Sequence, residues 1–182
     1  MPTAAPSTAS DLDNGYEDDW RSPQKSAADG GGPRAFRDAL GQFATGVCVI
    51  TALGPDGPIG LTANSFSSVS LEPPLVLWSV GLETPSATIF ARSQRFGISL
   101  LSADQEDVAL HFARSGVDKF QDDLTIAENG LPFVKNAAAR FDCETRFVYP
   151  GGDHDIIVGE VIRFSGGDTS HLVFHRGRFL SL

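Results

Sequence analysis

The chain has 182 residues, which favours a single domain, and 41% of them are hydrophobic, enough to build a core. Its 14 basic and 23 acidic residues give a formal net charge of −9, which argues against nucleic acid as a partner because a polyphosphate backbone requires clustered Lys and Arg. No apolar run reaches the ~18 residues of a membrane-spanning helix, and the N-terminus lacks a secretory pattern, so we expect a cytoplasmic protein without membrane attachment.

The first 33 residues differ in composition from the rest of the chain. They are rich in Ala, Ser, Pro, Gly and Asp and contain almost no large aliphatic side chains. Such a segment cannot bury enough apolar surface to offset the entropy of ordering, so residues 1–33 are predicted to form a disordered or loosely attached tail. Tyr16 and Trp20 are its only aromatic residues. The folded domain is predicted to span residues 34–182.

The first half of this domain begins with a short helix and continues with strands. Phe36, Leu40 and Phe43 have helical spacing. Strands are predicted at 46–53, 59–66 and 74–80, with a turn at 54–58 between the first two. Thr84 as an N-cap, followed by Pro85, predicts a helix through residues 86–92.

The second half continues the β pattern around one more helix. A strand is predicted at 95–101, and Ser102 with Gln105 forms a capping box before a helix at 106–113. Residues 114–137 are polar and predicted as loop, and three strand candidates follow at 138–150, 155–164 and 171–182. Strands joined by hairpin-like turns favour a mainly β fold, an antiparallel barrel or sandwich with short peripheral helices.

Two cysteines and four histidines give no metal-binding pattern. Cys48 and Cys143 belong to no CxxC pair and are expected to be small core residues of a reducing compartment. The histidines and acidic residues show no spacing typical of a metal site, so we expect no bound metal.

An unusual run of small hydroxyl and amide side chains occupies residues 60–80, GLTANSFSSVSLEPPLVLWSV. This run, together with QFATGVCVIT (42–51), GGDHDIIVGEV (151–161) and FHRGRF (174–179), resembles the flavin reductase domain family in order and spacing. The resemblance covers residues 34–182. It implies a split antiparallel (Greek-key) β-barrel of the FMN-binding type, and a homodimer with FMN or FAD at the dimer interface.

The resemblance also implies which residues contact the flavin. Small side chains let backbone approach a flat ring closely. The implied set is Gly60, Thr62, Ala63, Asn64, Ser65, Ser79, Val80, Gly81, Ser86, His111, Phe112 and Lys119. Within it, the Asn64 amide and the Thr62 hydroxyl are assigned to the ring edge or the ribityl chain. Ser86, in the first turn of a helix, is expected to help bind the flavin phosphate, with Lys119 supplying charge because His111 stands where the family often has arginine.

A second implied set contacts the nicotinamide cofactor. His154 is expected beside the nicotinamide, over the flavin, as the one catalytic residue, flanked by Asp153 and Asp155. Phe174, His175, Arg176 and Gly177 match the family's nicotinamide-dinucleotide contact, where Arg176 would pair with a phosphate.

These assignments predict an NAD(P)H-dependent flavin reductase. It would transfer hydride from NADH, with NADPH also possible, to FMN or FAD, and supply the reduced flavin to a partner flavin-dependent monooxygenase or halogenase. Hydride transfer requires stacked rings rather than a protein nucleophile, in keeping with a sequence that has no Ser–His–Asp or Cys–His pattern. The alternatives are a non-catalytic flavin-binding, storage or sensor protein, and an enzyme resembling pyridoxamine-phosphate oxidase.

Overall fold

The structure is a computed structural model that describes residues 21–121 and 123–181. The chain divides into two compact units, Met1–Leu40 and Gly41–Leu182. In the described part of the first unit, a 3-10 turn (Ala27–Asp29) is followed by helix α1 (Pro33–Leu40). The predicted tail at 1–33 falls mostly outside the described residues, as do Tyr16 and Trp20. Its disorder and the boundary at 33/34 stay predictions.

Helix α1 ends before the last of the three apolar residues whose spacing predicted it. It ends at Leu40, so Phe43 does not continue its apolar face, and the Phe43 side chain is 77% exposed. The reason is Gly41, the residue that follows Leu40, because glycine is unfavourable inside a helix and common just after its end.

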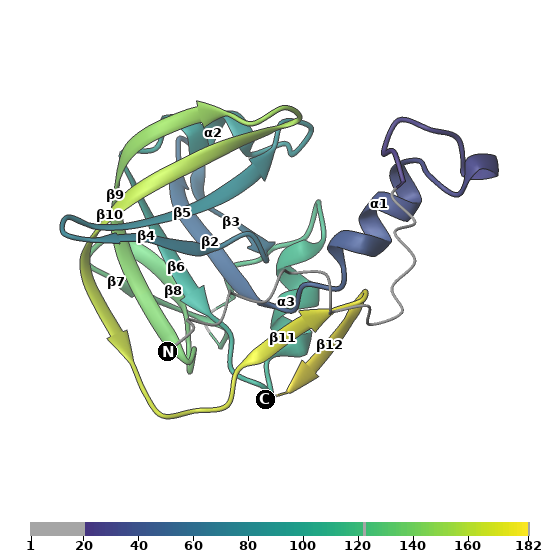
Figure 1. Ribbon diagram of the computed structural model, residues 1–182. Helices are drawn as coiled ribbons and strands as arrows, with labels where there is room; N and C mark the ends of the chain where they lie inside the picture. Colours follow the sequence, from purple (N-terminus) through teal and green to yellow (C-terminus); the bar gives the residue numbers. More distant parts are fainter. Residues whose placement is uncertain (1–20, 122, 182) are drawn as a thin grey trace, which may run out of the picture. The chain divides into compact units, whose positions relative to one another are not determined.

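Seven antiparallel strands form the main sheet of the second unit, in the order β3-β2-β6-β9-β10-β5-β4 (Figure 1). The strands are β2 (Cys48–Gly54), β3 (Gly57–Ala63), β4 (Ser67–Leu71), β5 (Pro74–Gly81), β6 (Arg95–Leu100), β9 (Ala139–Pro150) and β10 (His154–Gly166). β3 and β4, at the two ends of this order, are not hydrogen-bonded to each other. The sheet curls around a core, and both β3 and β4 remain open edges.

The core inside the curled sheet is built around Trp78 of β5. Trp78 is fully buried, and its indole meets Phe90 edge-on at 5.1 Å between ring centroids. Phe90 belongs to helix α2 (Ala87–Arg92), which lies at the upper end of the barrel in Figure 1. β2 contributes Cys48 and Ile50 to the same core. α2 thus covers one end of the barrel with its apolar side.

A second core lies on the other face of β2. Val47 and Val49 pack there with Phe112 of helix α3 (Glu106–Ala113) and Leu172 of β11. β11 (Leu172–His175) pairs with β1 (Thr45–Gly46) and with β12 (Arg178–Ser181) in a small sheet. Because both faces of β2 are covered, its sequence is a nearly continuous apolar run instead of an alternating one.

Besides β4, for which no strand was predicted, two segments contain more strand than predicted. The polar segment 114–137 includes a hairpin, β7 (Thr125–Glu128) and β8 (Leu131–Val134), and β8 is buried along its whole length. The single strand expected at 171–182 is a hairpin that turns at Arg176 and Gly177, both with positive φ. In each case a two-residue turn that includes a glycine divides the segment.

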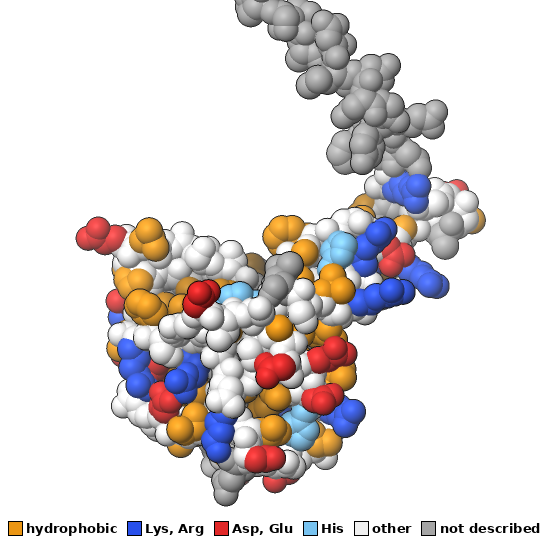
Figure 2. All heavy atoms as spheres, turned by 90° about the horizontal axis from the view of Figure 1, so that it is seen from below, with side chains coloured by type: hydrophobic (Ala, Val, Ile, Leu, Met, Phe, Trp, Pro, Cys, Tyr) orange, Lys and Arg blue, Asp and Glu red, His pale blue; other side chains and the backbone are white. Residues whose placement is uncertain are grey.

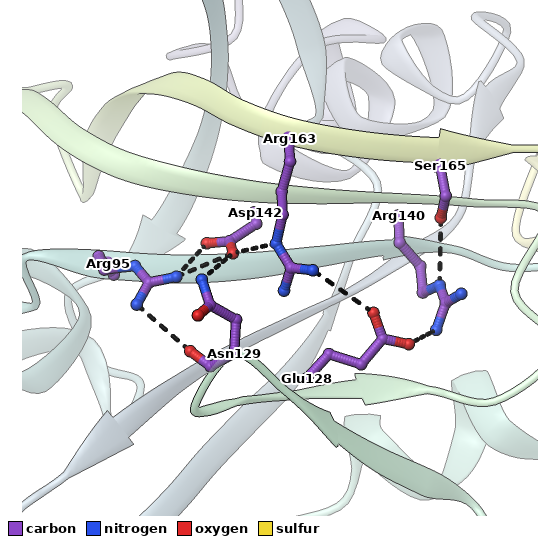
Figure 3. A network of polar contacts seen from close by, with 7 residues as sticks. All are labelled: Arg95, Glu128, Asn129, Arg140, Asp142, Arg163 and Ser165. Carbon is purple, nitrogen blue, oxygen red and sulfur yellow. Dashed lines mark hydrogen bonds and ion pairs between the residues drawn. The ribbon is translucent and has the colours of Figure 1, made fainter.

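A polar network fastens the β7–β8 hairpin to the barrel wall (Figure 3). At its centre is Asp142 of β9, 2% exposed, whose carboxylate accepts hydrogen bonds from Arg95 of β6 and Arg163 of β10, each at 2.8 Å. Asn129, at the hairpin turn, donates to the same carboxylate at 3.3 Å. Glu128 extends the network to Arg140 and, at 3.9 Å, to Arg163.

Helix α3 spans the predicted residues 106–113 and α2 begins one residue later than predicted, but neither helix has the N-cap that the sequence predicted. α2 starts at Ala87 with Ser86 as its N-cap, and Thr84 only accepts the Ala87 N–H through its backbone carbonyl. Before α3 the Gln105 side chain accepts the Ser102 N–H, as the capping box predicts. The Ser102 hydroxyl, however, donates to Asp104 instead of capping the helix, because residues 102–105 form a separate turn.

Other features agree with the sequence. Cys48 and Cys143 are buried and not disulfide-bonded, as expected for small core residues. Burial raises the pKa of each thiol to about 12. No helix in the described part of the chain has the length and apolarity needed to cross a bilayer.

Candidate functional site

A cavity of about 840 Å³ in the second unit opens where the sheet is not closed. It lies between the free edge of β3 and the end of β5. Its remaining wall comes from residues 115–120, after α3. The lining residues are Pro58, Ile59, Gly60, Leu61, Thr62, Ala63, Asn64, Ser65, Ser79, Val80, Gly81, Glu83, Thr84, Pro85, Ser86, Phe112, Ala113, Ser115, Gly116, Val117, Asp118, Lys119, Phe120 and His154.

β3 presents backbone groups to this cavity. Ile59, Leu61 and Ala63 pack toward the barrel core, so the alternate residues Gly60 and Thr62 face the other way. The Gly60 carbonyl accepts a hydrogen bond from outside the sheet, which shows that the Gly60 backbone points away from β2. In a β-strand, the N–H and C=O groups of one residue point to the same side, and those of the residue two positions along point there as well. The N–H groups of Gly60 and Thr62 therefore also point out of the sheet.

Two predicted flavin contacts already have partners within the chain. The Thr62 hydroxyl donates to the Ala109 carbonyl of α3 at 2.6 Å, which leaves it only lone pairs for a ligand. The Ser65 hydroxyl accepts from the Ser79 N–H at 2.9 Å and donates to the Ser79 carbonyl at 3.3 Å. The Thr62 hydroxyl therefore joins β3 to α3, and the Ser65 hydroxyl joins the segment after β3 to β5. The assignment of the Thr62 hydroxyl to the ring edge or the ribityl chain stays a prediction.

Three other side chains that were predicted to contact the flavin remain available to bind a ligand. Among the described residues, the Asn64 amide and the Ser79 and Ser86 hydroxyls have no hydrogen-bond partner, although all three residues line the cavity. Ser86 makes no capping bond to α2. Polar groups in a concave site without internal partners are the groups that a ligand can engage.

Gly60 serves packing within the chain. A Cβ atom there would lie 2.8 Å from Phe112 Cε1 and 3.1 Å from Phe120 Cζ. The two phenylalanine rings meet edge-on at 5.6 Å between centroids, and Phe112 is fully buried. Phe112 and Phe120 thus occupy the space beside the Gly60 Cα, and the flavin contact of the Gly60 backbone stays a prediction.

His154 lies at the rim of the cavity. It pairs with Gly81 across β10 and β5, and a Cβ on Gly81 would lie 3.5 Å from His154 Nε2. Its Nδ1 is 2.8 Å from Asp153 Oδ1. The hydrogen bond and charge of His154 hold the pKa of the exposed Asp153 carboxyl below its usual range. With Nδ1 engaged, Nε2 is the nitrogen left on the side of Gly81.

Five predicted residues do not line the cavity. His111 is half-buried beside it and has its Nε2 3.0 Å from the Asp118 carbonyl. Phe174 packs against Phe179 in the second core. Arg176 donates from its backbone to Gly41 and from its guanidinium to the Gln42 amide oxygen, with that amide turned to face it. His175 and Gly177 belong to the same hairpin. The nicotinamide role of residues 174–177 stays a prediction.

Sequence reasoning missed most of the wall formed by residues 115–120, of which it named only Lys119. It also did not place Glu83, Thr84 and Pro85 at the site. Their position between the predicted contacts Gly81 and Ser86, at the start of a predicted helix, was a signal that could have identified them. For 115–118 the only signal is the Ser115–Gly116 pair after a helix, which indicates a turn and no ligand.

The charges of the lining are mixed and few. Glu83, Asp118, Lys119 and His154 are its titratable residues. On the face drawn in Figure 2, acidic, basic and apolar side chains are interspersed. No group of three or more His, Cys, Asp or Glu side chains within residues 21–121 and 123–181 is arranged to hold a metal ion.

Residues 40–182 match a family model described as flavin reductase like domain. The chain is 47% identical over 147 residues to the FMN reductase (NADH) SmoA of Agrobacterium fabrum, covering 80% of this chain and 84% of that protein. It is 37% identical to the flavin-dependent monooxygenase reductase subunit HsaB of Mycobacterium tuberculosis, covering 82% of each.

A solved structure, the Streptomyces globisporus NADH:FAD oxidoreductase SgcE6 in complex with NAD and FAD fragments, superposes with a TM-score of 0.81 at 36% identity. The match covers 90% of this chain and 96% of SgcE6. The mainly β, split-barrel fold expected from the sequence is thereby confirmed. With a family match over its entire second unit and relatives of this identity, the chain belongs to the flavin reductase family.

Proposed function

We propose that this chain is an NADH-dependent flavin reductase that releases reduced FMN or FAD to a separate flavin-dependent monooxygenase or halogenase. The observation that carries the proposal is the cavity between β3 and β5, with His154 at its rim. In its wall, the side chains of Asn64, Ser79 and Ser86 have no hydrogen-bond partner among the described residues. The relatives support it, because SmoA is named an FMN reductase (NADH) and HsaB a monooxygenase reductase subunit.

The residues present fit a flavin. Its ring system is flat and carries donors and acceptors along one edge, which the outward N–H groups of Gly60 and Thr62 and the Asn64 amide can match. Asn64 and Ser79 offer both donors and acceptors, so either can serve the ring edge or the ribityl chain. The cavity volume lies within the range of sites that enclose small molecules.

The flavin supplies the capacity to accept a hydride, and the chain supplies position. The reaction needs a nicotinamide beside the ring, at a contact distance of about 3–3.5 Å between reacting atoms. His154 is the residue placed to orient it, because Nδ1 is engaged by Asp153 and Nε2 remains on the Gly81 side.

NADH is favoured over NADPH by the relatives, because SmoA is named an FMN reductase (NADH) and SgcE6 an NADH:FAD oxidoreductase. Because its substrate NADH belongs to the metabolic pool of the cell interior, we place the protein in the cytoplasm.

The decisive experiment mixes the purified full chain with NADH or NADPH and with FMN, FAD or riboflavin in a stopped-flow instrument. Rapid bleaching of the flavin absorbance by NADH, and slower bleaching by NADPH, is the expected result. If flavin stays bound through gel filtration but NAD(P)H is not oxidised, the chain is a flavin-binding or storage protein and not a reductase. A chain that neither binds nor reduces flavin would refute both.

We further propose that the chain forms a homodimer through the outer face of β5, β9 and β10. Leu77, Val158 and Phe147 lie in one row across these strands, and Ser79, Ile156 and Tyr149 form the next row. Phe147 and Tyr149 are each 50% exposed and stack at 5.7 Å. Large apolar side chains gathered on one sheet face are typical of a protein–protein interface.

Phe147→Glu is therefore expected to convert a dimer into a monomer in sedimentation velocity, since a buried unpaired carboxylate costs several kcal/mol. Phe164→Glu is the matched control, because Phe164 is a 77% exposed phenylalanine on β10, outside these two rows. A dimer that survives Phe147→Glu and is broken by Phe164→Glu would place the interface elsewhere.

A further inference from the structure

One wall of the cavity is a loop, residues 115–120, that follows the last turn of α3. Ser115 through Phe120 all line the cavity, and Arg114 through Asp118 are exposed. Few contacts of its own stabilise such a segment, so its position depends on the bonds that fasten it to its neighbours.

Lys119 makes the strongest of these bonds. Its Nζ donates to the Gly60 carbonyl on the β3 edge at 3.0 Å and to the Phe112 carbonyl in α3 at 2.8 Å. An ammonium has three N–H donors, so two are used within the chain. Partial burial lowers the pKa of Lys119 from its usual value. Both features describe a partly buried cation that bridges two backbone elements.

Two further contacts hold the same end of the loop. His111 Nε2 is 3.0 Å from the Asp118 carbonyl, and because a carbonyl only accepts, this nitrogen carries the hydrogen. The Phe120 ring meets Phe112 edge-on and covers the Cα of Gly60. Residues 118–120 are thus held against α3 and β3, while in the described part of the chain no side-chain hydrogen bond holds residues 114–117.

We propose that Lys119 is a positioning residue for the flavin, which latches the 115–120 loop against the edge of β3 and sets the width of the cavity, and does not bind the flavin phosphate. The proposal rests on the proposed function. It differs from the role that the family resemblance implied for Lys119, which was to supply charge to the phosphate.

The test compares FMN with riboflavin, which has the same ring and ribityl chain but no phosphate. In Lys119→Met, the dissociation constants of FMN and riboflavin, measured by quenching of flavin fluorescence, are expected to rise together by about tenfold. Their ratio stays as in the wild type. Amide hydrogen exchange of the loop in the ligand-free chain is expected to become faster. Arg114→Met is the control, because it removes a cation beside the same loop that does not line the cavity and has no bond to it.

A loss of FMN affinity with riboflavin affinity unchanged would overturn the proposal in favour of a phosphate contact. Unchanged exchange in the loop would overturn it as well. If Lys119→Met does not fold, the affinities of the wild type for FMN and riboflavin are measured at increasing salt concentration. A ratio of the two affinities that is independent of salt supports the latch, and a ratio of FMN to riboflavin affinity that falls with salt refutes it. A wild type that binds neither flavin refutes the proposed function, while the exchange measurement still tests the latch.

Discussion

Replacing His154 by alanine is expected to lower kcat/KM for NADH about 10- to 100-fold while flavin affinity stays within about twofold of the wild type. His154 lies at the rim of the cavity, beside Gly81, and makes no bond to the β3 edge where the flavin ring is proposed to lie. Its removal therefore affects the nicotinamide more than the flavin. Stopped-flow reduction, with flavin affinity measured separately by fluorescence, distinguishes the two effects.

Two neighbouring carboxylates provide the controls. Asp153→Asn removes the carboxylate that engages His154 Nδ1, so a loss of about two- to fivefold in kcat/KM is expected, as is usual for an exposed pair. Asp155→Asn removes an equal charge on the other side of His154 in the sequence. In the described chain the Asp155 side chain makes no bond to His154, so kcat/KM should change little. Weakened flavin binding in His154→Ala, with the reduction rate of bound flavin unchanged, would contradict the role of His154.

The sequence identified correctly the strands whose apolar pattern follows directly from which of their two faces are covered. β5 alternates between the barrel core and the outer face, and β2 is apolar because both of its faces are covered. The β7–β8 hairpin could not be found in this way. β7 is half exposed, and the hairpin is held by contacts of Asn129 and Glu128 with residues at least twelve positions away in the sequence.

The candidate site was predicted as a set of positions, and twelve of the residues named for it line one cavity. What each side chain does there was not predictable. The Thr62 hydroxyl is bound by Ala109, 47 residues away, and Lys119 by Gly60, 59 residues away. Which polar groups remain for a ligand depends on such contacts between elements, and these exist only once the strands and α3 are packed together.

Removing the Asp142 carboxylate has the largest expected effect on stability. Asp142→Ala leaves Arg95 and Arg163 without their shared partner, and breaking a buried ion pair costs about 3–5 kcal/mol. The lower end, about 3 kcal/mol, is expected because the side chains of Arg95 and Arg163 are 35% and 44% exposed and can be rehydrated. Urea unfolding measures the loss. Glu144→Ala is the control, since its exposed pair with Arg146 contributes about 1 kcal/mol or less.

The pH dependence of this effect tests its electrostatic origin. Burial raises the pKa of Asp142, but hydrogen bonds from Arg163, Arg95 and Asn129 outweigh burial and hold the pKa below its usual 3.8. A carboxyl with a lower pKa in the folded chain stabilises the fold fully above its unfolded pKa, and this contribution is lost as the pH falls through the folded pKa. The stability difference between the wild type and Asp142→Asn should therefore be constant near neutral pH and shrink below about pH 4. A difference that persists down to acid unfolding would mean that packing, and not the charge of Asp142, holds the hairpin against the barrel.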